Sequence, residues 1–117
     1  MASFLKRKSS NSIDGKSIKV AATATPGTLI HTAVAGTTLG TFDEIWLWAY
    51  NGHTSDGELS IEEGSGDSLP MKVTIPCKVG WIPIEPGFIL QNAVEIRAFA
   101  QVTNVIKIRA FVNTITD

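Results

Sequence analysis

Hydrophobic and polar residues alternate in short stretches along most of the chain, and Gly, Pro, Asn and Asp separate these stretches about every ten residues. An alternation with a period of two places successive side chains on opposite faces of a β-strand. Runs with helical spacing are nearly absent, and ten Gly and five Pro interrupt them. The pattern predicts strands over residues 17–24, 28–34, 43–51, 57–63, 71–76, 79–84 (continued by 88–90 after a kink), 93–100 and 105–114.

The predicted strand over 43–51 is hydrophobic on both faces. One face carries Ile45, Leu47 and Ala49. The other face is aromatic and consists of Trp46, Trp48 and Tyr50. A strand with two apolar faces is typical of the centre of a sheet that is covered on both sides. Because large apolar surfaces are rarely left open, we expect the aromatic face to be covered by a folded-back loop, by the segment 20–42 or by another subunit.

The last two predicted strands share a short repeat. Residues 96–99 read Ile-Arg-Ala-Phe, and the same four residues return at 108–111. We interpret the two strands as an antiparallel hairpin whose inward faces coincide, so that Ala98 lies near Ala110. The outer face of this hairpin would then present two arginines and two phenylalanines in one exposed patch: Arg97, Phe99, Arg109 and Phe111.

Together these strands predict an all-β protein, a single antiparallel β-sandwich of about eight strands. A jelly-roll and an immunoglobulin-like arrangement both fit the spacing of the strands, and the sequence does not choose between them. The sandwich domain is predicted to cover residues 17–117. Residues 1–16 are predicted to form a flexible basic N-terminal arm, because they combine a basic cluster with a Ser- and Asn-rich stretch.

Charge is distributed unevenly along the chain. In the predicted arm only Asp14 opposes four basic residues, which are Lys6, Arg7, Lys8 and Lys16. The segment 56–67 has the opposite bias, with five acidic residues and no Lys or Arg. We interpret residues 62–67 as a solvated acidic loop. Such a dipolar molecule would attract a charged partner, or the oppositely charged end of a neighbouring copy.

The composition excludes several functional classes. The chain has 117 residues, which suffices for one domain, and a net charge of −1. This balance excludes a globally basic nucleic-acid-binding domain, and we do not expect nucleic acid as a partner. The single cysteine, Cys77, excludes a disulfide framework and a cysteine-based zinc site. His31, His53 and Asp56 are the conceivable metal or acid-base set, but a zinc site would need at least one more strong ligand and no nucleophile motif is present, so we expect no metal, no cofactor and no enzymatic activity.

No targeting or membrane segment is expected. The basic residues at 6–8 are not followed by the apolar stretch of a signal peptide. The longest uncharged run, 20–42, is rich in Thr and Gly and is too polar to span a membrane.

Several strand sequences resemble small structural proteins of the virions of tailed bacteriophages. The similarity runs from about residue 29 to 115 and is carried by 42–51 (FDEIWLWAYN), 59–62 (LSIE), 73–76 (VTIP), Pro86-Gly87, 96–100 (IRAFA), 104–106 (NVI) and 111–113 (FVN). Proteins of this group are capsid decoration (cement) proteins or other minor head components. The resemblance implies a β-sandwich that binds and stabilises the assembled capsid shell, with the major capsid protein as its partner. It also implies a dimer or trimer on the capsid surface, assembled in the host cytoplasm, and brings no catalytic residue.

Two sets of residues are candidate contact sites. Contacts with the capsid or another partner are predicted where positive charge meets exposed rings, at Lys6, Arg7, Lys8, Arg97, Phe99, Arg109 and Phe111. A subunit interface is predicted at Trp46, Trp48 and Tyr50. Two alternatives stay open. One is another virion component, such as a tail or head-fibre module, and the other is a carbohydrate-binding adhesion module in which Trp46, Trp48 or Trp81 stacks on sugar rings.

Overall fold

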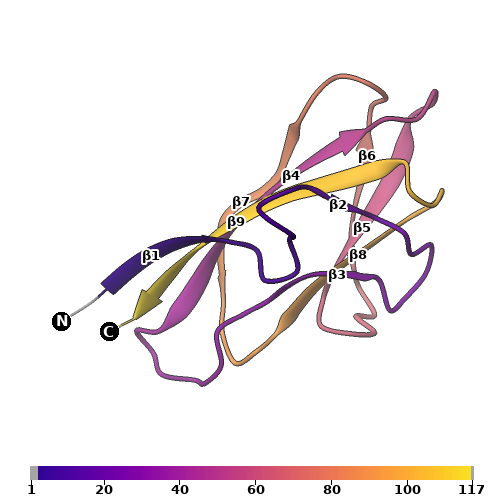
Figure 1. Cartoon of the computed structure of the whole chain (residues 1–117). Helices are drawn as coiled ribbons and strands as arrows, with labels where there is room; N and C mark the ends of the chain where they lie inside the picture. The colour runs from indigo at the N-terminus through magenta and orange to yellow at the C-terminus, as the bar shows by residue number, and fades with distance from the viewer. Residues whose placement is uncertain (1–2, 117) are drawn as a thin grey trace.

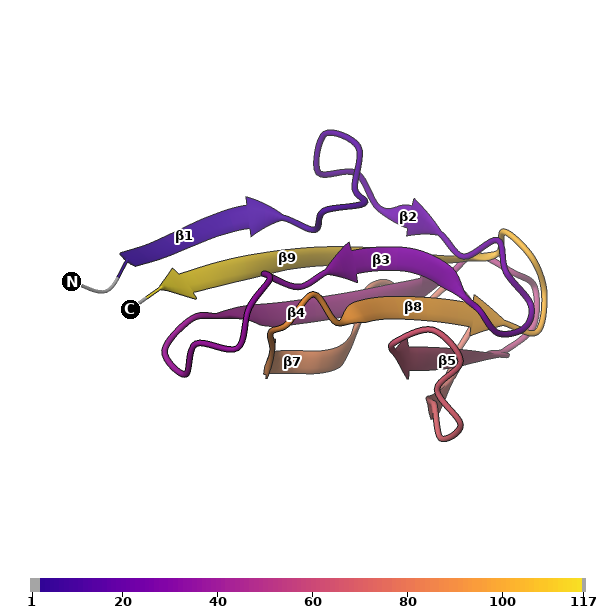
Figure 2. The same cartoon turned by 90° about the horizontal axis from the view of Figure 1, so that it is seen from below.

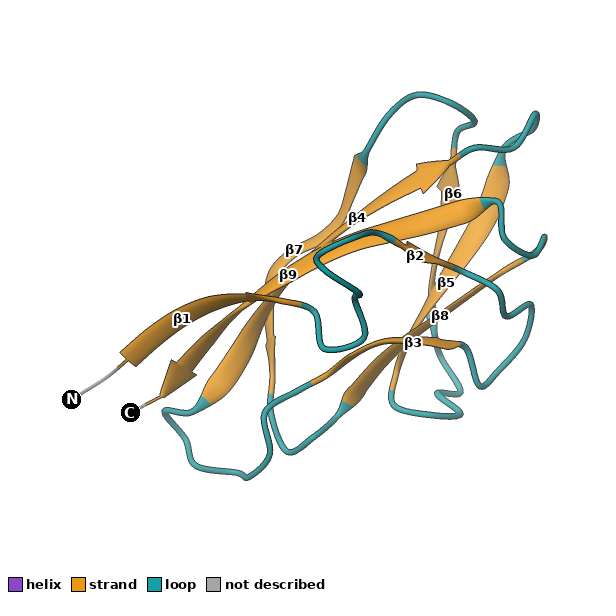
Figure 3. Cartoon of the chain, viewed as in Figure 1, coloured by secondary structure: helices purple, strands orange, loops and turns teal. Residues whose placement is uncertain are grey.

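Two antiparallel β-sheets pack face to face and enclose one hydrophobic core (Figure 1). The structure is a computed structural model that describes residues 3–116. Every regular element in this range is a strand (Figure 3). The strands are β1 (Ser3–Lys8), β2 (Ile18–Lys19), β3 (Thr28–Thr32), β4 (Phe42–Asn51), β5 (Gly57–Glu63), β6 (Met71–Ile75), β7 (Ile82–Leu90), β8 (Glu95–Ala100) and β9 (Ile106–Thr116). The predicted all-β antiparallel sandwich is therefore confirmed.

The strands divide into two sheets that we name A and B. Sheet A has the order β1-β9-β4-β7, and β2 also pairs with β9. Sheet B has the order β3-β8-β5-β6. Figure 2 shows that β1 and the C-terminal end of β9 extend together past the end of β3. Among residues 3–116, no helix is long and apolar enough to cross a membrane.

The core lies between the two sheets. Alternation along β4 turns Ile45, Leu47 and Ala49 into this core, where all three are buried. β4 hydrogen-bonds to β9 on one side and to β7 on the other, so its predicted central position is confirmed. Sheet B contributes the inward residues of β5 and β8, which are Leu59, Ile61, Ile96, Ala98 and Ala100. Because burial holds these alternate positions inward, the remaining side chains of each strand face outward.

The predicted hairpin between the last two strands is wrong. β8 pairs with β3 and β5 in sheet B, whereas β9 pairs with β1, β2 and β4 in sheet A. Ala98 faces Ile61, and Ala110 faces Leu47. The inward face of β8 can be buried in either sheet, because the hydrophobic effect has no direction. The repeat therefore places Arg97 and Phe99 on the opposite side of the molecule from Arg109 and Phe111.

The prediction of a flexible basic arm is also wrong for residues 3–8. This segment forms β1, which pairs with β9 through six consecutive residues from Ser3↔Thr116 to Lys8↔Phe111. The chain then turns, and Ser9 and Ser12 are buried against the body of the protein. The long β9 strand explains the difference, because its C-terminal half would otherwise have only one neighbour in the sheet.

The prediction of a solvated acidic loop fails at one residue. Glu62 lies on the outer side of sheet B but has no exposed surface, because the segment before β3 covers it. Its two carboxylate oxygens accept hydrogen bonds from the Thr25 hydroxyl at 2.6 Å and from the Gly27 backbone amide at 2.7 Å. Glu63, the next residue, is exposed.

The ends of several strands differ from the prediction. The first predicted strand, 17–24, is regular only at Ile18–Lys19. The sixth begins at Ile82 and continues through the predicted kink to Leu90. β7 tolerates Pro83 and Pro86 because it is an edge strand, and bulges shift its register with β4 at two places.

Candidate functional site

The outer face of sheet A carries a cluster of aromatic side chains. Alternation along β4 turns Trp46, Trp48 and Tyr50 outward, and the register places Trp46 opposite Phe111 of β9. The Phe111 ring stacks on Trp46 at a centroid distance of 5.8 Å and on Trp48 at 5.6 Å. Trp81 comes from the loop before β7, and the centre of its ring lies 5.9 Å from the centre of the Tyr50 ring. The stacked pairs of Phe111 and the tilted pair of Tyr50 and Trp81 are favourable arrangements for aromatic rings and give the face a fixed shape.

These rings cover one another in part, and all of them remain half-buried or exposed within the single chain. The segment 20–42 does not cover them, because it supplies β3 of the opposite sheet. Of the three predicted covers, the structure thus shows a loop contribution, from Trp81. The face retains exposed aromatic surface, which is typical of a surface that meets a partner.

Basic side chains lie directly on these rings. Lys6 Nζ of β1 is 4.6 Å from the centre of the Phe111 ring. The Arg109 guanidinium carbon of β9 is 4.7 Å from the centre of the Trp81 ring. A cation over an aromatic face is stabilised by the negative potential of the ring. Both cations are therefore held in place while their outer sides stay open to an anion.

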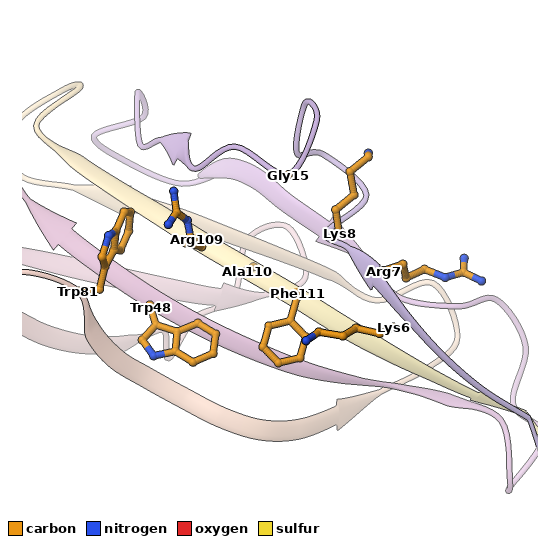
Figure 4. A pocket seen from close by; sticks show the side chains of 9 residues that line it. All are labelled: Lys6, Arg7, Lys8, Gly15, Trp48, Trp81, Arg109, Ala110 and Phe111. Atoms are coloured by element: carbon orange, nitrogen blue, oxygen red, sulfur yellow. The ribbon is translucent and has the colours of Figure 1, made fainter.

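A groove of about 590 Å³ runs between β1 and the aromatic cluster (Figure 4). Its lining combines four cations with three rings and two small residues. These are Lys6, Arg7, Lys8 and Arg109, then Trp48, Trp81 and Phe111, and finally Gly15 and Ala110. No carboxylate is among these lining residues. Such a groove suits a ligand or partner segment that has negative charge together with flat or apolar groups.

The acidic residue of this face, Glu44, is turned toward its own sheet. Its Oε1 accepts hydrogen bonds from Asn113 Nδ2 at 3.0 Å and from Trp46 Nε1 at 2.9 Å. These two bonds lower the pKa of the Glu44 carboxyl below its usual value of 4.5, and the bond from Asn113 has the larger effect. The carboxylate orients the Trp46 ring, and it is not among the residues that line the groove.

The structure brings together most of the predicted contact residues. Five of the seven line the groove, namely Lys6, Arg7, Lys8, Arg109 and Phe111. Trp48, predicted as an interface residue, lines it as well, and Trp46 and Tyr50 lie beside it. No signal in the sequence indicates the contributions of Gly15 and Ala110, because their positions depend on how three distant segments meet.

Arg97 and Phe99 lie elsewhere, on the outer side of sheet B. Arg97 Nε donates to Glu95 Oε1 at 2.9 Å, and its Nη1 donates to the Gly27 carbonyl oxygen at 2.9 Å. Through the second of these bonds, the Arg97 guanidinium holds the segment before β3 in place. Arg97 is therefore a structural residue in this fold, and the predicted patch that joined it to Arg109 is wrong.

The two histidines have different surroundings. His31 is buried and its Nε2 lies 2.7 Å from Asp43 Oδ2, while its Nδ1 accepts the Ser10 backbone N–H at 2.9 Å. Nε2 therefore carries the proton and donates to Asp43. Because a backbone amide occupies the other ring nitrogen, His31 has no atom free to activate a nucleophile. His53 lies in a turn, with its Nδ1 3.0 Å from the Ser55 hydroxyl.

Among residues 3–116, no three His, Cys, Asp or Glu side chains lie close enough together to hold a metal ion. In the comparisons with known proteins, no protein-family model matches the chain, and no significant match appears among the curated proteins or the solved structures. The groove and the aromatic face of sheet A are therefore the candidate functional site.

Proposed function

We propose that this protein is a non-enzymatic attachment module, a structural protein of a phage virion that binds the assembled capsid shell through the outer face of sheet A and stabilises it. The observation that carries the proposal is the groove lined by four basic residues, two of which, Lys6 and Arg109, hold their cations over partly exposed rings. Aromatic and arginine side chains dominate the binding energy of protein interfaces, and a rigid arrangement reduces the entropy lost on binding.

One expectation from the sequence and one feature of the groove favour a shell as the partner. The strand sequences from 42–51 to 111–113 resemble small virion proteins, and the groove is open, as a surface that docks onto another surface requires. A protein of this kind binds a symmetric lattice in many copies. If it also forms a dimer or trimer, weak single contacts add up through avidity.

The proposal is tested with purified heads that lack the protein. Recombinant full-length chain is added to these heads, and the number of bound copies is measured by quantitative mass spectrometry. We expect Phe111→Ala to reduce the apparent affinity by about tenfold or more, because it removes a central ring of the cluster.

The chain offers a matched control for this experiment. Phe99 occupies the equivalent place in the Ile-Arg-Ala-Phe repeat but faces outward from sheet B. Phe99→Ala should leave the occupancy of the heads unchanged. Equal occupancy for wild type and Phe111→Ala, or a loss confined to Phe99→Ala, would contradict the proposed docking face.

A second candidate function is the carbohydrate-binding adhesion module. It is favoured by one observation, that Trp48 and Trp81 line the same groove as the cations. This composition would select acidic sugars, because flat rings stack on the sugar and the cations pair with its carboxylate or sulfate. Quenching of tryptophan fluorescence by acidic oligosaccharides, with no binding to heads, would favour this function over shell attachment.

A further inference from the structure

The four strands that end the two sheets differ in how their outer edges are protected. A strand at the edge of a sheet presents unpaired backbone N–H and C=O groups that can pair with another strand. In sheet A one edge is β7 and the other is β1, which the two-residue β2 continues along β9, and in sheet B the edge strands are β3 and β6. Two of these four edges, those of β7 and β3, are interrupted by bulges and by prolines or a covering segment, and the edge of β6 is short and flanked by prolines.

β7 contains Pro83 and Pro86, which lack a backbone donor, and two bulges interrupt its register. β3 has a bulge between Leu29 and His31. Its outer side is covered by residues 10–11, since the Asn11 backbone amide donates to the Ile30 carbonyl oxygen at 3.4 Å and Asn11 Nδ2 donates to the Leu29 carbonyl oxygen at 2.8 Å. β6 has five residues, with a proline directly before it and another directly after it.

β1 has none of these features. Its six residues pair with β9 without a register shift, and it has no other partner strand within residues 3–116. All six residues are exposed, including the apolar Phe4 at 63% and Leu5 at 55%. Three consecutive basic residues follow: Lys6, Arg7 and Lys8. Only the positive charge of β1 therefore protects this edge. It repels basic strands of other chains but not acidic ones.

We propose that the free edge of β1 accepts an extended acidic segment of a partner protein as an added antiparallel β-strand. The backbone would supply hydrogen bonds on alternate residues, and the basic side chains would select acidic residues opposite them. The inference goes beyond the proposed function, since it concerns the backbone edge of β1 and not the rings of the groove.

The charges of β1 argue against a second copy as the occupant. Antiparallel pairing of two β1 strands would bring six cations into one short ribbon, and this concentration of positive charge opposes the pairing. A nucleic acid also fits this edge poorly. Its phosphates can accept from the outward N–H groups, but they leave the outward carbonyl groups without a donor, whereas an added peptide strand satisfies both.

The probe is the capped peptide Glu-Glu-Glu-Val-Val-Thr, titrated into the full, isotope-labelled chain and followed by NMR. In antiparallel register its glutamates lie opposite Lys8, Arg7 and Lys6, and its valines lie opposite Leu5 and Phe4. We expect shifts in β1 and in its partner strand β9. We also expect slower hydrogen exchange at every second amide of β1, because alternate N–H groups of an edge strand point outward.

Two controls separate strand addition from simple charge attraction. The peptide Glu-Pro-Glu-Val-Pro-Thr keeps two carboxylates but cannot form the ladder, and it should not slow exchange in β1. The double variant Lys6→Glu/Lys8→Glu should weaken binding of the first peptide by about tenfold. Lys72→Glu/Lys78→Glu changes the net charge equally at exposed positions away from this edge and should leave binding unchanged.

Absence of slowed exchange in β1, or equal binding of the proline-containing peptide, would overturn the inference. It would also be overturned by self-association through β1 that the peptide cannot displace, which would assign the edge to a second copy. Tighter binding of a hexathymidylate than of the acidic peptide would assign the edge to nucleic acid instead. Each result is independent of whether Phe111→Ala reduces the occupancy of heads, so the two proposals fail separately.

Discussion

Glu62 and Gly27 form a fully buried contact between sheet B and the segment that leads into β3. Glu62 Oε1 accepts the Gly27 backbone N–H at 2.7 Å, and its other oxygen accepts the Thr25 hydroxyl at 2.6 Å. Arg97, which lies opposite Glu62 in the ladder, donates to the Gly27 carbonyl oxygen at 2.9 Å. Side chains from two neighbouring strands thus hold both polar groups of one glycine, and this fixes the path of the chain over sheet B.

Replacing Glu62 should destabilise the protein strongly. Glu62→Ala leaves the buried Gly27 amide and the Thr25 hydroxyl without their acceptor, and removing a charged acceptor from a buried donor costs about 2–4 kcal/mol. The measurement is the free energy of unfolding from urea titration. The neighbouring Glu63→Ala removes an exposed carboxylate and should change that free energy by about 0.5 kcal/mol or less. Similar effects for the two variants would show that Glu62 is not held as described.

Gly27 should tolerate no side chain. A Cβ atom at this position would lie 2.6 Å from the backbone carbonyl carbon and oxygen of Ala98, closer than atoms can pack without moving a strand. We expect Gly27→Ala to cost about 2 kcal/mol or more. At Gly52 the nearest atom to a Cβ is a ring carbon of Tyr50 at 3.4 Å, so Gly52→Ala is the matched control. A Tm for Gly27→Ala within 2 °C of wild type, taking about 4 °C per kcal/mol, would contradict the close approach.

The buried pair of His31 and Asp43 should anchor the chain between β1 and β2. His31→Ala removes a donor from Asp43 and the acceptor of the Ser10 amide, which we expect to cost about 2–4 kcal/mol. Hydrogen exchange of residues 9–16 should rise in this variant before global unfolding, since one of the contacts that hold them is lost. His53→Ala, in a turn, is the control. Unchanged exchange at residues 9–16 would show that other contacts hold this loop.

Glu85 should make stability depend on pH. Burial, and then the nearby charge of Glu63, raises the pKa of the Glu85 carboxyl above its usual 4.5. The folded state therefore binds this proton more tightly than the unfolded state, and stability falls as the pH rises from 4.5 through the raised pKa. Glu85→Gln should raise the Tm at neutral pH and lose this advantage below pH 4.5.

Glu44 is the control for Glu85, because its pKa is shifted in the opposite direction and its effect on stability has the opposite dependence on pH. Its pKa is lowered by hydrogen bonds from Asn113 and Trp46, so its contribution to stability is present above pH 4.5 and is lost as the pH falls through the lowered pKa. Glu44→Gln should therefore lower the Tm at neutral pH. A Glu85→Gln advantage that persists unchanged at low pH would show that the effect does not come from ionisation.

Much of the fold follows from local pattern. The period-two alternation predicts which residues of β4 and β8 are buried, because one face of each strand must leave water. In β5 and β9 it predicts most of the buried apolar residues but not the buried polar ones, such as Ser60, Glu62 and Asn113. β5 has the predicted bounds, Gly57–Glu63. The strand pairing does not follow from this pattern, since Ile96 and Ala98 can be buried equally well from either sheet.

The candidate site, like the fold, could be predicted only in part from the sequence. Its residue types were predictable, because basic residues beside aromatic ones indicate a contact surface wherever they are placed. The groove itself depends on β1, β4 and β9 being neighbours, which brings Lys6, Trp48 and Phe111 together from distant parts of the chain. The sequence by itself determined an all-strand protein with a charged and aromatic surface. Only the tertiary structure decided which strands share a sheet, because that choice rests on long-range pairing and on a burial energy that has no direction.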